Sequence, residues 1–440
     1  MRNLATIFLL LLAVSCQQKD MKQQLIVPTD ATYLNQSVRR LNDVVIFDIF
    51  SPPVASRVYA YSTLAAFEAG RWMDTSYHSL TAQLNGFPEL PEPDSGKTYD
   101  FRIASIRAFF SITQKLTFTK DSSRITEEQI LKEMKDGVDH DVYRTSLLFG
   151  EAVAEAIWRR AAKDNYKEVQ GMARYAPSDK PGKWKVTPPD YLDAVQPFWT
   201  MIKPLVMDSS SQFKPEPPPA FSADTASQFY KEMKEVYDVS KTLTEEQKTV
   251  ARFWDDNAAA ITYKGHMMFA NKKPSPGGHW MNISAIAIKK SNLNWLQAAQ
   301  TYALVAVSMY DAFISCWDEK FRSEYIRPVT AINEIMDKNW LPFLQTPPFP
   351  EYTSGHSVAS ATIAAMLTSI FGDNFAFTDD YELPYIGIQR DFPSFIKASE
   401  EACVSRLYGG IHFKAAIVNG RTQGRALGAF VVGKLRYKKI

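Results

Sequence analysis

Apolar side chains recur at steps of three or four residues along much of the chain. One stripe runs from Val38 through Leu41 and Val45 to Ile49, and after a Pro-Pro pair a second stripe covers residues 54–65. This spacing matches the 3.6-residue period of an α-helix rather than the two-residue period of a strand. The pattern therefore predicts two consecutive helices near the amino terminus.

The same periodicity continues through the rest of the sequence, whereas segments that alternate like strands are few. Further amphipathic stretches cover 98–117, 139–162, 224–239, 243–259, 292–316, 322–337, 356–371 and 410–436. The stretch at 243–259 opens with Thr244-Glu245-Glu246-Gln247, which is typical of a capping box at a helix start. The fold class predicted is all-α, a multi-helix bundle.

Proline-rich breaks at 178–189 and 214–219 interrupt the periodic segments. They predict a boundary near residue 200, between an amino-terminal helical part, 29–200, and a carboxyl part, 201–440. Apolar periodicity continues on both sides of the boundary, which favours one compact body over two independent domains.

The amino terminus reads as an export signal. Residues 1–16 combine one early positive charge, an apolar run and Ala13-Val14-Ser15-Cys16, which resembles a lipobox with Cys16 as the acylated residue. The alternative is plain export with cleavage near Ser15. Residues 17–28 are largely polar and form a predicted tether. We expect an exported protein, a periplasmic or cell-envelope lipoprotein of a bacterium, with membrane contact only through a lipid anchor at Cys16.

Composition narrows the choice of partner. Fifty basic and 48 acidic residues leave a net charge of +2, which gives no support for a nucleic-acid partner. Any positive field must then be local, made by a few placed side chains. Cys316 and Cys403 show no metal-ligand or redox spacing and lie in apolar stretches, where buried free thiols are expected.

The first of three basic motifs runs from Lys320 to Pro328 and contains Arg327. The seven-residue spacing of the two cations equals two helical turns, so one helix face can present both. Taken alone, such a pair is more often a solvated helix face.

The second motif, Ser354-Gly355-His356, follows a proline-rich loop and precedes a run of small and apolar residues. This order predicts a loop entering a buried helix, whose unpaired N–H groups and positive dipole end can bind an oxyanion. Gly355 permits close approach, and His356 adds a proton donor. The alternative is that Ser354 simply caps a helix beside a surface histidine.

The third motif is Ser405-Arg406 followed by Gly409-Gly410 and His412. The planar guanidinium of Arg406 can grip an oxyanion, and the glycine pair lets His412 open the next helix. A histidine in this position, taken alone, is more often structural. Together the three motifs place the predicted oxyanion site at helix ends in the carboxyl half.

The order Lys-x6-Arg-Pro, Ser-Gly-His and Ser-Arg-x3-Gly-x-His, over residues 320–412, resembles the signature shared by vanadium-dependent haloperoxidases and type 2 phosphatidic acid phosphatases. The resemblance implies five groups that hold the oxygens of vanadate or phosphate: Lys320, Arg327, Ser354, the Gly355 backbone and Arg406. It also implies that His412 bonds to vanadium, or attacks phosphorus in a phosphatase. His356 is then the acid–base group, and Lys320 makes an oxygen electrophilic.

Further residues bear on which of the two reactions occurs. Trp317, one helical turn before Lys320, and Phe349 resemble the halide-side wall of haloperoxidases, although both are alternatively ordinary core aromatics. Asp256 is the predicted carboxylate that orients Arg406. Ala416 stands where many family members, phosphatases especially, have Asp, so His412 needs another partner to fix its tautomer.

Thr353 and four further histidines are predicted to have no catalytic role. Thr353 replaces the usual proline before Ser-Gly-His and is expected only to loosen the turn. The other histidines match no motif and are interpreted as structural: His78, His140, His266 and His279.

The sequence thus predicts a vanadate-dependent haloperoxidase, similar to bacterial iodoperoxidases, that oxidises halide with hydrogen peroxide to hypohalous acid. Iodide, the easiest halide to oxidise, is the first expectation. The alternatives are a phosphomonoesterase with a phosphohistidine at His412 and a non-catalytic oxyanion-binding envelope protein. The organic acceptor, the oligomeric state and the role of the amino-terminal half stay open.

Overall fold

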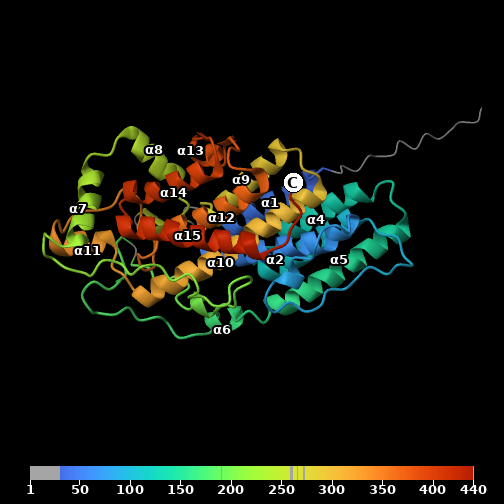
Figure 1. Cartoon of the computed structure of the whole chain (residues 1–440), viewed down its shortest axis with the longest axis horizontal. Helices are drawn as coiled ribbons and strands as arrows, with labels where there is room; N and C mark the ends of the chain where they lie inside the picture. The colour runs from blue at the N-terminus through green and yellow to red at the C-terminus, as the bar shows by residue number, and fades with distance from the viewer. Residues whose placement is uncertain (1–29, 190, 258–260, 265, 271–272, 440) are drawn as a thin grey trace, which may run out of the picture.

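Helices carry almost all of the regular structure of the chain (Figure 1). The structure is a computed structural model that describes residues 30–439 apart from 190, 258–260, 265 and 271–272. These residues contain fifteen α-helices and two short hairpins, so the predicted all-α class is confirmed. The predicted export signal, the lipobox at Cys16 and the tether lie outside the described residues.

The amino-terminal part contributes five long helices: α1 (Thr32–Phe47), α2 (Pro52–Gly70), α3 (Phe101–Leu116), α4 (Lys120–Lys135) and α5 (His140–Ala161). Helix α2 is buried along its whole length from Pro53 to Gly70. It is rich in alanine, whose small side chains let α3, α5 and α10 pack against it from several sides.

The carboxyl part is built around α10 (Trp295–Ser323), a helix of 29 residues that packs against both α2 and α12 (Gly355–Phe371). Around it lie α9 (Pro276–Lys290), α14 (Phe395–Tyr408) and α15 (Lys414–Lys434). One cluster of buried apolar residues runs from Ala31 to Leu435 and includes side chains of both parts. The helices that carry the basic motifs are therefore anchored in the main core.

Shorter elements surround this core. Three helices lie at one end of the molecule: α7 (Gln228–Lys241), α8 (Glu245–Phe253) and α11 (Pro328–Ile335) (Figure 1). Two short helices lie within loops, α6 (Tyr166–Gln170) and α13 (Leu383–Ile386). Three 3-10 turns cover Arg71–Met73, Thr81–Gln83 and Trp199–Met201. The antiparallel hairpins pair β1 (Ile261–Lys264) with β2 (Met267–Ala270) and β3 (Phe377–Asp379) with β4 (Arg390–Phe392).

Most predicted helices are present, with corrected ends. The capping box at Thr244 is confirmed, but α8 ends at Phe253 rather than at 259. The helix predicted over 322–337 is wrong at its start, because α10 continues to Ser323 and α11 begins only at Pro328. Five helices have no counterpart among the predicted ranges: α4, α6, α9, α13 and α14. The sequence of α4 is largely polar, and α9 opens with a Gly-Gly pair that reads as a loop.

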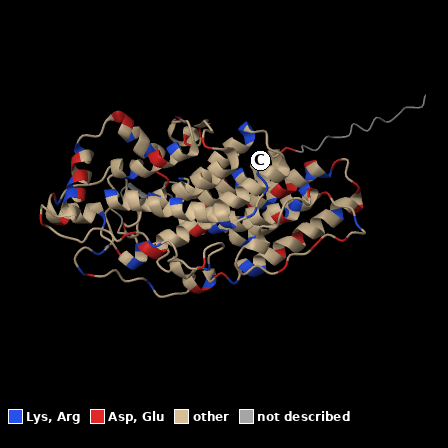
Figure 2. Ribbon diagram, viewed as in Figure 1, with Lys and Arg blue, Asp and Glu red and all other residues tan. Residues whose placement is uncertain are grey.

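Charged residues of both signs are spread over the two ends of the molecule, while the central helices carry few of them (Figure 2). Among the described residues, no helix has the length and apolar character needed to cross a membrane. The cations of the three motifs are an exception to this distribution, because they lie inside the protein.

Candidate active site

The three motifs meet at a cavity of about 130 Å³. Its lining includes, from the motifs and the predicted wall, Trp317, Phe349, Gly355, His356, Arg406 and His412. These side chains come from the end of α10, the loop before α12, the start of α12 and the two ends of the α14–α15 connection. Lys320, Arg327 and Ser354 do not reach the lining but are buried directly behind it.

Lys320 is completely buried, and its ammonium group binds the loop before α12. Nζ donates to the carbonyl oxygens of Pro350, Glu351 and Thr353 at 2.9, 3.0 and 2.6 Å. Burial lowers the pKa of Lys320 to about 7, but three carbonyl acceptors favour the ammonium form with its three hydrogens. A direct contact between Lys320 and an oxyanion would require one of these hydrogen bonds to be exchanged.

Arg327 reaches the same place by a different route from the one predicted. The prediction that one helix face presents both Lys320 and Arg327 is wrong. Glu324 adopts a left-handed conformation (φ 48°) that ends α10, and Arg327 is the N-cap of α11. Its Nε donates to the Phe349 carbonyl at 2.9 Å, and its Nη1 donates to the Ile411 carbonyl at 2.8 Å. Within the described part of the chain, Nη2 is buried and has no hydrogen-bond partner.

His412 has a buried carboxylate partner that the sequence analysis did not identify. Its Nδ1 lies 2.8 Å from Oε1 of Glu351, which also accepts the N–H of Phe413 at 2.8 Å. On the other side of the ring, Nε2 lies 3.3 Å from Nη1 of Arg327. Arginine can only donate, so Nε2 carries the lone pair and Nδ1 carries the hydrogen.

This assignment holds whether or not Glu351 is ionised. Burial raises the pKa of Glu351 to about 8, against the opposing charge of Arg327. The second oxygen, Oε2, has no partner among the described residues, so a proton there leaves Oε1 free to accept. Burial, followed by the charges of Arg327 and Lys320, lowers the pKa of His412 well below its usual value. His412 is therefore a neutral ring with Nε2 available as a ligand atom.

The second motif forms the start of α12, as predicted. Ser354 is the N-cap, and its side chain accepts the N–H of Ser357 at 3.3 Å. The capping role that the sequence left as an alternative is thus present, but the neighbouring histidine is not at the surface: the side chain of His356 is 14% exposed and lines the cavity. Burial, then the charge of Arg406, lowers the pKa of His356 to about 4, which keeps the ring neutral.

The predicted pairing of Asp256 with Arg406 is wrong. Arg406 donates to Ser405 Oγ at 2.9 Å and to the Trp254 carbonyl, whereas the carboxylate of Asp256 lies 3.4 Å from His356 Nε2 and 2.9 Å from His279 Nδ1. Asp255 and Asp256 line the cavity together with Arg406. Burial lowers the pKa of the Arg406 guanidinium, and the charges of these two acids oppose that effect. His279, interpreted as structural, therefore contacts a residue that touches the site.

The aromatic wall also has a support that the sequence did not reveal. The rings of Trp317 and Phe349 lie 4.9 Å apart, and Lys320 Nζ lies 5.0 Å from the Phe349 ring centre. Trp317 Nε1 donates to the Val195 carbonyl at 3.1 Å. Val195 and the turn between α1 and α2, including Ile49, line the same cavity. Residues of the amino-terminal part thus complete the site.

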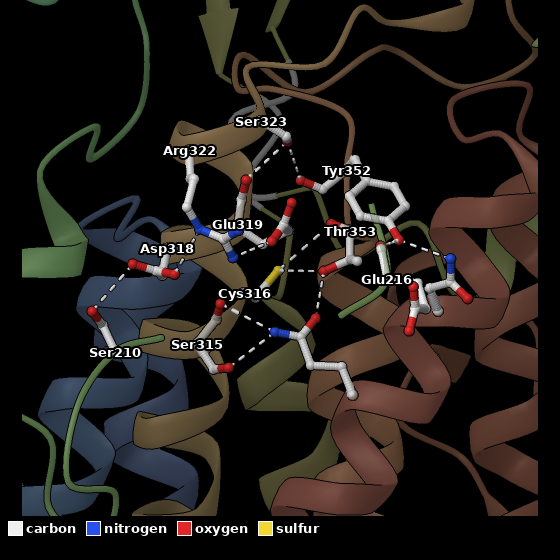
Figure 3. Close-up of polar contacts among 12 residues, drawn as sticks. Ser210, Glu216, Ser315, Cys316, Asp318, Glu319, Arg322, Ser323, Tyr352 and Thr353 are labelled. Carbon is white, nitrogen blue, oxygen red and sulfur yellow. Dashed lines mark hydrogen bonds and ion pairs between the residues drawn. The ribbon is translucent and has the colours of Figure 1, made fainter. Parts of the chain in front are cut away.

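Thr353 does more than the expected loosening of the turn. Its hydroxyl donates to Gln423 Oε1 at 2.8 Å, and Gln423 Nε2 donates to Ser315 Oγ at 2.9 Å. Figure 3 shows Thr353 facing Cys316 and Ser315 of α10. Since Thr353 also accepts from Lys320, this network fixes the loop that carries the second motif to α10. Cys316 and Cys403 are both buried free thiols, as predicted.

Comparisons with known proteins agree with this arrangement. The family model "VCPO second helical-bundle domain" matches residues 300–438. The crystal structure of "the first bacterial vanadium dependant iodoperoxidase" superposes with a TM-score of 0.89 at 44% sequence identity, covering 94% of this chain and 99% of that chain. No match was found among the curated protein sequences.

More distant structures share the fold. A holo-type bacterial vanadium-dependent chloroperoxidase has a TM-score of 0.66 at 18% identity, over 88% of this chain and 93% of that chain. An apo-type bacterial vanadium-dependent chloroperoxidase has a TM-score of 0.64 at 17% identity, over 87% of this chain and 94% of that chain.

Fold and site together define an all-helical enzyme built around a buried oxyanion cradle. The chain belongs to the vanadium-dependent haloperoxidases. Its cofactor is accordingly vanadate, and its substrates are hydrogen peroxide and a halide.

The residues present fit an anionic group at this position. Three buried cations, Lys320, Arg327 and Arg406, converge beside a neutral His412, and Nη2 of Arg327 is a buried donor with no acceptor among the described residues. A buried unpaired donor costs about 1–3 kcal/mol, which an oxyanion would offset. The same positive surroundings keep Nε2 of His412 unprotonated. Its lone pair accepts from Nη1 of Arg327 in this structure and would bind a metal centre once that hydrogen bond is exchanged.

Proposed function

We propose that this haloperoxidase oxidises iodide in preference to the other halides. The single observation that carries the proposal is the setting of His412: a ligand nitrogen fixed by Glu351, beside an unpartnered guanidinium nitrogen, in a cavity walled by Trp317 and Phe349. Iodide is the largest, most polarisable and least strongly hydrated of the common halides. An aromatic wall costs iodide least in lost hydration.

A second argument comes from similarity. The structure with 44% identity over nearly the whole chain is that of an iodoperoxidase. Halide selectivity also depends on the residues that line the cavity, so the proposal needs a direct test on this chain.

The site residues have the following proposed roles. His412 Nε2 would bind the vanadium, and the oxygens would be held by Arg327, Arg406, the Gly355 N–H and, after exchange of hydrogen bonds, Ser354 and Lys320. Bound vanadate supplies a Lewis-acidic centre that activates hydrogen peroxide toward halide. His356 would take up and return a proton through Nδ1, because its Nε2 faces Asp256.

The test is a comparison of halides at fixed peroxide. The purified protein, reconstituted with orthovanadate, is assayed with iodide, bromide and chloride over the same pH range. The proposal expects kcat/KM for iodide to exceed that for bromide by at least about tenfold, equal to about 1.4 kcal/mol of transition-state stabilisation. Equal or greater efficiency with bromide or chloride would refute iodide preference while leaving haloperoxidase activity intact.

One observation keeps phosphoester hydrolysis as a second candidate activity. The absence of a carboxylate at Ala416 disfavoured a phosphohistidine at His412, but Glu351 supplies that carboxylate from another element. A chromogenic phosphomonoester assay without vanadate measures this activity directly. A non-catalytic oxyanion-binding protein would bind phosphate or vanadate and show no turnover in either assay.

We also propose that the chain is exported and anchored through Cys16. The support is the apolar run and lipobox-like ending of residues 1–16. In a bacterial host that acylates lipoproteins, the wild type is expected in the membrane fraction and Cys16→Ser in the soluble envelope fraction. An unacylated wild type would refute the anchor.

A further inference from the structure

A chain of four ionisable side chains leads away from the cavity into the core. Nε2 of His356 lies 3.4 Å from Oδ2 of Asp256, Oδ1 of Asp256 lies 2.9 Å from Nδ1 of His279, and Nε2 of His279 lies 2.9 Å from Oδ2 of Asp379. The four residues come from α12, the loop after α8, α9 and β3. His356 and Asp256 line the cavity, while the side chains of His279 and Asp379 are 0% exposed.

Aromatic rings surround the middle of this chain. His279 stacks on Trp254 with ring centres 4.6 Å apart and contacts the rings of Phe253 and Tyr381 at 5.3 and 5.1 Å. Two carboxylates in such an apolar setting are costly unless a cation lies between them. His279 directs both ring nitrogens at carboxylates, which matches the doubly protonated imidazolium, because each nitrogen then donates.

The electrostatics agree with the geometry. Burial alone would lower the pKa of His279, but the charges of Asp256 and Asp379 outweigh it and raise that pKa well above its usual value. Burial would raise the pKa of Asp256, but His279 and then His356 lower it. Of the other charged groups nearby, Glu382 has its pKa raised by burial and by Asp256, and Lys273 opposes that shift.

We propose that His279 and Asp379 are positioning residues that hold the Asp256 carboxylate against Nε2 of His356. Oδ2 of Asp256 and Nε2 of His356, 3.4 Å apart, form no hydrogen bond in this structure, but a carboxylate so placed favours the hydrogen on Nε2. Nδ1 is then the nitrogen that exchanges protons with the cavity. The inference rests on the proposed acid–base role of His356 and adds three supporting residues behind it. A purely structural polar cluster would have no reason to end at a cavity histidine.

A bound cation is the competing interpretation of the same residues. Ligand atoms of Asp256, His279 and Glu382 lie within 4.8 Å of one another. A metal ion would have to replace one of the two contacts between His279 and the carboxylates, since both ring nitrogens are already engaged. The two interpretations therefore predict different protonation of His279.

The first experiment uses vanadate-free protein labelled with ¹⁵N at histidine, with signals assigned by substitution of each of the six histidines. At pH 7 we expect His279 to carry hydrogen on both nitrogens and His356 to carry it on Nε2. In His279→Gln, loss of the imidazolium charge should move the titration of the His356–Asp256 pair to higher pH by about one unit. If His279→Gln does not fold, Asp379→Asn takes its place in the experiment and should alter the protonation of His279.

Asp164→Asn is the matched control. Asp164 is equally buried and is bound by Arg57 at 2.7 Å in the amino-terminal part, without contact with the cavity. This variant should lose stability and leave the His356 titration unchanged. The proposal is overturned by a singly protonated His279 in the wild type, by an unmoved His356 titration in His279→Gln, or by a stoichiometric divalent cation in the purified protein.

The second experiment separates this inference from the proposed function. With vanadate bound, the acidic limb of the kcat/KM profile for halide should move to higher pH in His279→Gln, in the same direction as the titration. A moved titration with an unmoved limb would support the positioning role and refute His356 as the acid–base group. A loss of rate that is equal at every pH, with neither the His356 titration nor the acidic limb moved, would make His279 purely structural and overturn the proposal.

Discussion

Oε1 of Glu351 lies 2.8 Å from Nδ1 of His412, so the acid directs the opposite nitrogen of the ring toward Arg327 and the cavity. Glu351 belongs to the loop that Lys320 fixes through three carbonyl oxygens. The lysine, the acid and the histidine are thereby coupled, which gives Lys320 a positioning function in addition to its charge.

Glu351→Gln should weaken vanadate binding by about 10- to 100-fold, the usual effect of losing a partner of a metal-bound histidine. The amide can turn its NH₂ toward His412 and donate to Nδ1, which would move the ring hydrogen to Nε2, the ligand atom. The measurement is a vanadate titration of the stripped protein. Glu68→Gln is the control, because Glu68 is a buried acid that accepts the N–H groups of Leu80 and Thr81 far from the cavity. Equal affinity in Glu351→Gln and the wild type would contradict the role of Glu351.

Trp317→Ala should reduce kcat/KM for halide by about tenfold, because it opens the dry wall beside the site. Vanadate affinity should change little, since Trp317 supplies the wall rather than an oxyanion donor. Trp317→Phe keeps an aromatic ring but loses the hydrogen bond to Val195, so its kcat/KM for halide should fall between those of the wild type and Trp317→Ala. Steady-state kinetics with iodide and bromide give the ratio. Loss of vanadate binding without a change in halide kinetics would show that the ring supports the cradle instead.

The fold and the motif residues were largely predictable from the sequence, whereas the side-chain contacts of the motif residues were not. Apolar periodicity indicates a helix such as α10 because burial leaves a stripe in the sequence. The partners of His412 and Asp256 are far away in the chain: Glu351 lies 61 residues before His412, and His279 lies 23 after Asp256. Such pairs leave no local pattern in the sequence. The family pattern places the carboxylate partner of His412 at position 416, where this chain has Ala416. The site contribution of Ile49 likewise depends on packing between distant helices.

The stability of the vanadate-free protein should depend on pH through His279. Its folded pKa lies well above the unfolded value of about 6.5, so its contribution is fully present below pH ~6.5 and is lost as the pH rises through the folded pKa. The difference in unfolding free energy between the wild type and His279→Gln should therefore shrink on the alkaline side. Urea unfolding at several pH values measures it. A difference that stays constant from pH 6 to strongly alkaline pH would mean that His279 is neutral in the folded protein.

Asp311→Asn should destabilise the protein by about 1–3 kcal/mol. The buried Asp311 carboxylate on α10 accepts the N–H groups of Leu205, Val206 and Met207 at 2.7–2.8 Å. An asparagine has one acceptor oxygen, so its NH₂ group would face a backbone donor. Urea unfolding gives the change. In the control Asp318→Asn, the partners are the hydroxyls of Thr200 and Ser210, which can reorient, and the partly exposed guanidinium of Arg322, so a smaller loss is expected. Equal losses in the two variants would contradict the argument.

The most direct test of the account is triiodide formation from iodide and hydrogen peroxide, followed as orthovanadate is titrated into the stripped protein. We predict activity that rises to saturation at one vanadate per chain, is suppressed by phosphate and is absent in His412→Ala. Iodide oxidation that is independent of vanadate or survives in His412→Ala would contradict the account. So would phosphomonoester turnover that vanadate inhibits, with no iodide oxidation at any vanadate concentration.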